Sequence, residues 1–128
     1  KEVPNEMVSS LGIIEHSVEE GRLYRVTNLV EKPSLVDAPS NLAIIGRYVL
    51  TPEIFDALER TDPGVLGEIQ LTDAIRRLLN SQSVYSYQFP GYHIDTGTPV
   101  GLLKASVHAA LQRDDVALDL RKWLEGQF

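Results

Sequence analysis

The sequence contains no cysteine, and this absence excludes several classes of site at once. Disulfide bridges, cysteine-based zinc sites and thiol nucleophiles all require that side chain. A chain without cysteine fits a reducing compartment, so we expect a cytoplasmic protein. Long hydrophobic runs are missing too, since none approaches the roughly 20 residues of a membrane-spanning helix. The sequence therefore predicts no membrane partner.

Basic residues are in the minority, with 12 Lys and Arg against 18 Asp and Glu and a formal net charge of −6. No segment gathers Lys or Arg into a cluster, so the chain lacks the basic patch of a nucleic-acid binder. We expect no nucleic-acid partner. A length of 128 residues favours a single domain.

Several catalytic motifs are also missing. The histidines His16, His93 and His108 form no i, i+4 pair, which makes a zinc site improbable. The sequence has no Gly-x-Ser-x-Gly nucleophile and no glycine-rich phosphate loop. Phosphate chemistry would therefore need help from outside this segment.

The elements that are present mix strands with helices, which indicates an α/β or α+β class. Runs at 11–17 and 21–32 predict a hairpin that turns near Gly21, and the apolar run 42–50 predicts a strand buried on both faces. Residues 84–91 predict a short strand with 92–99 as its irregular partner.

Helical patterns occupy most of the remaining sequence. Thr51 and Pro52 predict an N-cap and first position of one helix, with Ile54, Phe55 and Leu58 inward. The next helix has Ile75, Leu78 and Leu79 inward. Thr98 and Pro99 open a longer helix, and a last helix gathers Val116, Leu120, Trp123 and Leu124 on one face.

The step Glu31-Lys32-Pro33 places opposite charges at the end of a predicted strand. Pro33 biases Lys32 toward an extended backbone, and neighbours on an extended chain point to opposite sides unless the strand ends or twists there. One interpretation is a carboxylate for sugar-like hydroxyls beside an ammonium for a phosphate. The other is a solvated strand end.

The stretch His93-Ile-Asp95-Thr96-Gly97-Thr98 also has two interpretations. An Asp oxygen at the mouth of a helix could hold Mg²⁺ with a bound phosphate, because a helix N-terminus favours anions. Equally, Asp95 and Gly97 could form a turn, with Thr98 capping the helix and no ligand at all.

The stretch "GEIQLTDA" places Glu68, Gln70, Thr72 and Asp73 close together. A capping box would need Glu or Gln three residues after Thr72, where Ile75 stands. Thr72 is therefore expected to act as a simple N-cap.

The stretches "GIIE", "VEKP", "APSNLAIIGRYVLTPEIFDAL", "GEIQLTDAI" and "DTGTPVGLLKA" occur here in an order and spacing that resembles the bacterial UTP–glucose-1-phosphate uridylyltransferases, or UDP-glucose pyrophosphorylases. The resemblance covers nearly all of this chain but only the carboxyl-terminal half of that enzyme. The resemblance implies that residues 1–128 form the sugar-phosphate-binding portion of a nucleotide-diphospho-sugar transferase. Its fold would be a Rossmann-like α/β fold, with a mixed sheet and flanking helices.

The resemblance also implies the roles of individual residues. Glu31 would bind glucose hydroxyls, and Lys32 would be the catalytic lysine that binds the phosphate of glucose 1-phosphate. Gly12 would let the sugar approach the backbone closely. Leu11 stands where the family usually has tyrosine, which puts local packing in doubt.

Three further residues come from the same resemblance. Asn41 and Ala43 would line the sugar pocket from the following strand. Asp95 would be the second of two aspartates that position Mg²⁺. The first aspartate and the family's "GxGTR" loop for UTP do not occur here, so we expect a fragment that is inactive alone.

Two other functions stay open. A related nucleotidyltransferase that uses dTTP, CTP or ATP shares the Glu-Lys-Pro and Asp-x-Gly steps. A non-catalytic assembly module is the other, with helices around Trp123 serving subunit contact, although ordinary core packing also explains Trp123. Family members often oligomerise, so we expect a homo-oligomer.

Overall fold

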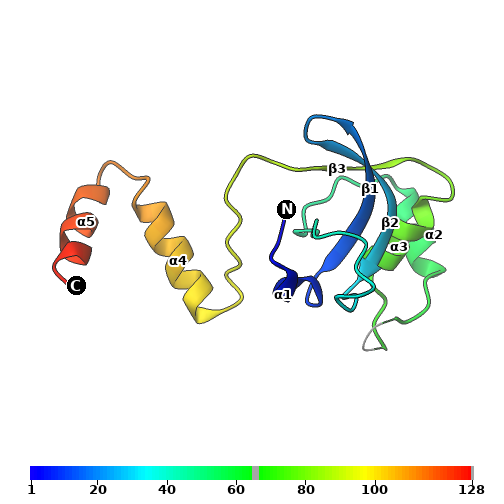
Figure 1. Cartoon of the computed structure of the whole chain (residues 1–128), viewed down its shortest axis with the longest axis horizontal. Coiled ribbons are helices and arrows are strands. Elements are labelled where there is room, and N and C mark those ends of the chain that lie inside the picture. Colours follow the sequence, from blue (N-terminus) through cyan, green and yellow to red (C-terminus); the bar gives the residue numbers. More distant parts are fainter. Residues whose placement is uncertain (65–66, 128) are drawn as a thin grey trace. The chain divides into compact units, whose positions relative to one another are not determined.

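The computed structural model describes residues 1–64 and 67–127, apart from the side chains of Val18 and Glu19. The chain forms two compact units, Lys1–Pro90 and Gly91–Phe128 (Figure 1). The first unit combines a three-stranded antiparallel sheet, in the order β1-β2-β3, with short helices. The predicted α/β class is confirmed, and no helix among the described residues is long and apolar enough to span a bilayer.

The elements have the following bounds. In the first unit they are α1 (Asn5–Val8), β1 (Gly12–Glu20), β2 (Leu23–Glu31), α2 (Glu53–Glu59), α3 (Leu71–Leu78) and β3 (Val84–Tyr87). In the second unit they are α4 (Pro99–Ala110) and α5 (Ala117–Glu125).

Strands β1 and β2 form the predicted hairpin. The turn contains Gly21 at φ +56°, a left-handed backbone that glycine adopts without strain. Pairing runs from Glu20 opposite Leu23 at the turn to Gly12 opposite Glu31 at the open end. The hairpin therefore brings the start of β1 against the end of β2.

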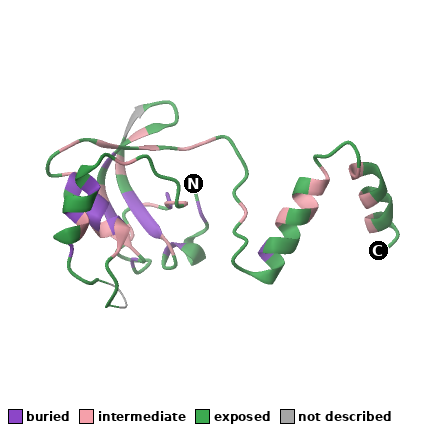
Figure 2. Cartoon of the chain, turned by 180° about the vertical axis from the view of Figure 1, so that it is seen from behind, coloured by how far each residue is buried: buried purple, intermediate pink, exposed green. Residues whose placement is uncertain are grey.

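The core lies where α3 packs on β2 and α2 packs on α3. Buried residues of the hairpin and of one face of each helix supply it, as the purple segments of Figure 2 show. Burying one such aliphatic side chain contributes about 1.5–3 kcal/mol. The buried members are Ile14, Val26, Leu29, Leu42, Ile54, Ala57, Ala74, Ile75 and Leu78.

A smaller cluster of Val3, Val8, Ile13 and Ala43 attaches the segment around residue 42 to β1. Ser40 pins the same segment, since its hydroxyl donates to the carbonyl of Ile14 at 2.7 Å and accepts from the N–H of Leu42 at 3.0 Å.

The prediction of a doubly buried strand over 42–50 is wrong. Leu42 and Ala43 make isolated bridges only, and residues 44–50 form no strand. The reason is Gly46, whose φ of +71° turns the backbone out of the extended region. Beyond it Val49 is fully exposed, at 102%.

Helix α2 begins later than predicted, with Pro52 rather than Thr51 at the N-cap and no side-chain cap. The hydroxyl of Thr51 bonds Glu53 instead, which lowers the pKa of that carboxyl. The inward face consists of Ile54 and Ala57, with the predicted Leu58 partly buried against the same core, whereas Phe55 is 68% exposed. The prediction of Phe55 as a core residue is wrong.

In the second unit the start of α4 follows the prediction. Thr98 is the N-cap, and its hydroxyl oxygen accepts from the N–H of Gly101 at 3.0 Å. Residues 92–99, predicted as an irregular partner of the preceding strand that ends in a tight turn, pair with no strand. The turn is present, since Asp95 Oδ1 accepts from the N–H of Gly97 at 2.8 Å.

Helix α5 has no buried residue, and Trp123 is 60% exposed. The interpretation of Trp123 as a core residue is therefore wrong for the described residues of this unit. An apolar helix face is buried only when another element covers it, and α4 buries only Gly101.

Candidate functional site

The site predicted around Glu31 lies at the open end of the hairpin. Gly12 is the register partner of Glu31, and the N–H of Lys32 donates to the carbonyl of Leu11 at 3.0 Å. Neighbouring side chains can serve one site only where the strand ends or twists. Strand β2 ends at Glu31, so Glu31 and Lys32 meet this condition.

Lys32 has a φ of +46° and is the one non-glycine residue with positive φ in the described part of the chain. The prediction of an extended Lys32 is therefore wrong. The bias from Pro33 is outweighed by the hydrogen bond to Leu11 and by the burial of Pro33, which together fix the turn. Left-handed non-glycine residues cost free energy and gather at functional sites, and the Lys32 side chain is exposed.

Glu31 has a partner from a distant part of the sequence. The hydroxyl of Thr72, on the first turn of α3, donates to Oε2 of Glu31 at 2.6 Å. Thr72 itself is buried, with a relative exposure of 5%. This bond fixes one oxygen of the half-buried carboxylate.

Thr72 was expected to cap α3, and that expectation is wrong. Helix α3 starts at Leu71 with Gln70 at the N-cap in an extended conformation, and no side chain caps it. Sequence reasoning missed the contact with Glu31. The available signal was the Ile75 that breaks the capping box, which removes one local explanation for a threonine here.

Gly12 lies directly against this pair. A Cβ at Gly12 would come within 2.9 Å of Glu31 Oε2, 3.1 Å of Thr72 Oγ1 and 3.1 Å of Ile44 Cδ1. Gly12 has no positive φ, so space rather than backbone freedom requires the glycine. The carboxylate and the hydroxyl occupy the place that a side chain would fill.

Tyr48 is a further neighbour that sequence reasoning missed. Burial, and after it the negative charge of Glu31, raise the pKa of the Tyr48 phenol. The ring is 40% exposed. Tyr48 thus belongs to the surroundings of the carboxylate, and no sequence pattern pointed to this contact.

Asn41 and Ala43 lie beside β1. The carbonyl of Asn41 accepts from the N–H of Val3 at 3.0 Å, and its side chain is exposed. Ala43 is buried, and its N–H donates to the carbonyl of Lys1 at 2.8 Å. Their predicted contact with a sugar stays a prediction.

Asp95 belongs to the second unit and is exposed. Its Oδ1 accepts from the N–H of Gly97, which is the turn that the sequence offered as one alternative. Within residues 1–64 and 67–127, no group of three or more His, Asp and Glu could hold a metal ion. The magnesium role of Asp95 stays a prediction.

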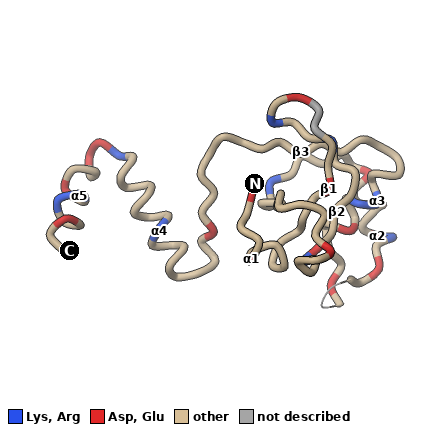
Figure 3. Tube along the Cα trace, viewed as in Figure 1, with Lys and Arg blue, Asp and Glu red and all other residues tan. Residues whose placement is uncertain are grey.

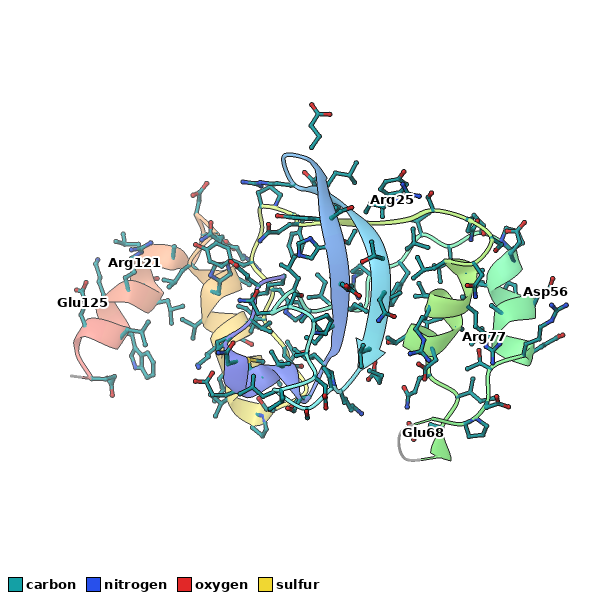
Figure 4. The ribbon with its side chains drawn as sticks, turned by 45° about the vertical axis from the view of Figure 1, so that its right-hand side comes forward. Arg25, Asp56, Glu68, Arg77, Arg121 and Glu125 are labelled. Carbon is teal, nitrogen blue, oxygen red and sulfur yellow. The ribbon has the colours of Figure 1, made fainter. Side chains whose placement is uncertain are left out.

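Acidic and basic residues are both spread along the chain, as the red and blue segments of Figure 3 show. A cavity of about 500 Å³ beside α3 is lined by two ion pairs, Arg76 with Asp73 at 3.6 Å and Arg77 with Asp62 at 3.7 Å. Figure 4 labels Arg77 of the second pair. Such exposed pairs contribute about 0–1 kcal/mol. Opposite charges balance there, so the cavity has no charge with which to select an ion.

Residues 1–112 match the family described as Nucleotidyl transferase. The chain belongs to the nucleotidyl transferase family. Among curated members of the nucleotidyl transferases, the UTP–glucose-1-phosphate uridylyltransferase of Staphylococcus epidermidis is 46% identical over 125 residues, which are 98% of this chain and 43% of that protein. The enzyme of the same name from Streptococcus pyogenes is 49% identical over 123 residues, or 95% of this chain and 40% of that protein.

Solved structures show the same likeness as the sequences of these relatives. A UDP-glucose pyrophosphorylase complexed with UDP-glucose matches 88% of this chain and 43% of its own, with a TM-score of 0.83 and 44% identity. A UTP-bound enzyme from Acinetobacter baumannii matches 95% of this chain and 42% of its own, with a TM-score of 0.81 and 35% identity. The predicted resemblance is confirmed, and the chain spans less than half the length of these relatives.

Proposed function

We propose that this nucleotidyl transferase chain supplies the sugar-phosphate side of a UTP–glucose-1-phosphate uridylyltransferase. The observation that carries the proposal is the junction of Gly12, Glu31 and Lys32 at the end of the hairpin, in a chain 46–49% identical to enzymes of that name. The uridylyltransferase would form UDP-glucose and pyrophosphate from UTP and glucose 1-phosphate.

In the proposed reaction, a phosphate oxygen of glucose 1-phosphate attacks the α-phosphorus of UTP in line. A new P–O bond forms, and the bond to the β-phosphate breaks to release pyrophosphate. This chemistry needs positioning and charge neutralisation more than covalent help from the protein. Glu31 would accept hydrogen bonds from sugar hydroxyls, and the Lys32 ammonium would neutralise the sugar phosphate.

Asp95 is the proposed magnesium ligand of this chain. Its exposed carboxylate is a hard oxygen donor of the type that Mg²⁺ prefers, and its turn hydrogen bond uses Oδ1. Mg²⁺ usually keeps waters and substrate phosphates beside one or two carboxylates, so a single aspartate from this chain fits. When bound, the ion would neutralise negative charge on the phosphates.

Assembly into a homo-oligomer is part of the same proposal. The second unit exposes large apolar side chains on both helices, including Leu103 at 65% and Trp123 at 60%. Apolar helix faces of this kind are typical of surfaces that another element covers. The cysteine-free composition supports a cytoplasmic location.

The test is a pyrophosphate-release assay on the full-length protein that carries this chain. Glucose 1-phosphate would be offered with UTP, dTTP, CTP and ATP in turn. We expect release with UTP well above the other three nucleotides. Preference for another nucleotide would assign the chain to a related sugar nucleotidyltransferase, and no release with any would favour a non-catalytic module.

A further inference from the structure

We propose that Thr72 is a positioning residue for Glu31 and that Gly12 is a glycine so that these two side chains can meet. The inference rests on the proposed function, in which Glu31 receives sugar hydroxyls. It assigns Thr72 a part in substrate binding and gives Gly12 a task other than direct contact with the sugar.

The hydrogen bond from Thr72 gives the two oxygens of the Glu31 carboxylate different roles. Thr72 Oγ1 donates to Oε2 at 2.6 Å, a length typical of a hydroxyl donating to an ionised carboxylate. A hydroxyl has one hydrogen to donate, and it is committed to this bond. Oε2 is thereby held in place, and the other oxygen would accept the hydrogen bond of a substrate hydroxyl.

The donor is held rigidly. Thr72 is 5% exposed and lies on α3 beside Ala74 and Ile75, which are 0% and 2% exposed in the core. A threonine side chain has few rotamers, so a packed helix fixes the direction of its hydroxyl. The position of α3 in the core therefore determines the orientation of a carboxylate 41 residues away in sequence.

Gly12 provides the space. Its carbonyl accepts from the N–H of Ile44 at 2.9 Å and it pairs with Glu31 across the hairpin, so the backbone of Gly12 is held from both sides. A methyl group there would meet Glu31 Oε2 at 2.9 Å and Thr72 Oγ1 at 3.1 Å. Because the backbone cannot retreat, the methyl group would push the carboxylate away from the hydroxyl.

The experiment uses the full-length protein that carries this chain and compares Thr72→Val with Thr72→Ser. Valine keeps the shape and removes the hydroxyl, whereas serine keeps the hydroxyl. We expect Thr72→Val to raise the KM for glucose 1-phosphate about tenfold, as for loss of a bond to a charged group. The KM for UTP should stay within about twofold, and Thr72→Ser should approach the unaltered protein.

Thr61→Val is the matched control. Thr61 is a second buried threonine, at 6% exposure, whose hydroxyl donates to the carbonyl of Ala57 at 2.7 Å. The Thr61→Val variant loses a comparable hydrogen bond that does not involve Glu31. The KM values for glucose 1-phosphate and for UTP should therefore stay unchanged. Equal KM effects from Thr61→Val and Thr72→Val would overturn the positioning role, since the loss would then be structural.

Gly12→Ala provides an independent variant. We expect the same selective rise in the KM for glucose 1-phosphate, because the added methyl group displaces the carboxylate. Unchanged kinetics in both Thr72→Val and Gly12→Ala, with the unaltered protein active, would overturn the inference alone. If the unaltered protein forms no UDP-glucose, the proposed function fails and this inference falls with it.

Where Thr72→Val does not fold, as judged by its thermal melting curve, the pair Thr72→Ser and Thr72→Ala decides the matter. These two variants differ by one hydroxyl. A selective KM rise in Thr72→Ala that is absent in Thr72→Ser supports the inference, and identical KM values contradict it.

Discussion

The carboxylate of Glu31 and the hydroxyl of Thr72 are joined by a 2.6 Å hydrogen bond across 41 residues of sequence. The bond links the end of β2 to the first turn of α3, and Gly12 leaves the room for it. Local structure at the hairpin end is thus tied to the packing of a helix. Each side of this junction can be altered separately.

Lys32→Ala should weaken the binding of glucose 1-phosphate far more than that of UTP. The lost ammonium would neutralise the sugar phosphate in the proposed site. Steady-state kinetics of the full-length protein would show the KM for glucose 1-phosphate rising by an order of magnitude or more. Equal effects on both substrates would contradict the role given to Lys32.

The 128-residue chain alone should form no detectable UDP-glucose from UTP and glucose 1-phosphate. It contains no glycine-rich phosphate loop, and it spans 40–43% of its curated relatives. Chromatographic detection of the product, with the full-length protein as positive control, checks this. Product above the no-protein background would refute it.

Ile75→Ala should destabilise the first unit by about 2–5 kcal/mol, because Ile75 is 2% exposed in the core between α3 and β2. Ile69→Ala is the matched control, since Ile69 is 55% exposed, and it should change the unfolding free energy by less than about 0.5 kcal/mol. Urea unfolding followed by circular dichroism measures both. Similar midpoints for the two variants would show that the core is assigned wrongly.

Glu31→Gln should lower the pKa of Tyr48 part of the way to its ordinary value. Burial is the larger cause of the raised pKa and the charge of Glu31 the second, so only the second is removed. Ultraviolet titration with Tyr48→Phe as the subtracted reference isolates this phenol among the five tyrosines. No shift would mean that Tyr48 and Glu31 do not interact.

The same raised pKa fixes the sign of a pH effect on stability. A phenol whose pKa is higher in the folded state contributes stability that is fully present below the ordinary value of about 10. That contribution disappears as the pH rises through the raised pKa. Stability of the unaltered protein should therefore fall more steeply above pH 10 than stability of Tyr48→Phe.

Sequence patterns predicted those parts of the fold that short-range physics determines. The hairpin followed from two apolar runs around Gly21, and the start of α4 followed from Thr98 and Pro99, because turn and cap preferences act within a few residues. The prediction for the run 42–50 failed, because its composition is that of a buried strand while the positive φ of Gly46 turns the backbone out of the extended region.

The residues of the candidate site were proposed from the sequence, but the contacts between them could not be. The roles of Glu31, Lys32 and Gly12 were predicted from the resemblance and stay predictions, and the structure adds that the strand register brings Gly12 opposite Glu31. The contact with Thr72 is long-range, and a threonine at a helix start has the same local pattern whether it caps the helix or bonds another element. Only the folded chain distinguishes the two.

Ser40 and its neighbours have a consequence for how the sheet can grow. The outer side of β1 is occupied at its first residues, because the carbonyl of Ile14 receives the Ser40 hydroxyl and the N–H of Ile14 donates to the carbonyl of Leu42. An irregular segment thus blocks this part of the sheet edge from pairing with strands of other molecules. Among the described residues, β3 forms the opposite edge of the sheet, so strand addition from another molecule is directed to β3 and to the part of β1 beyond Ile14.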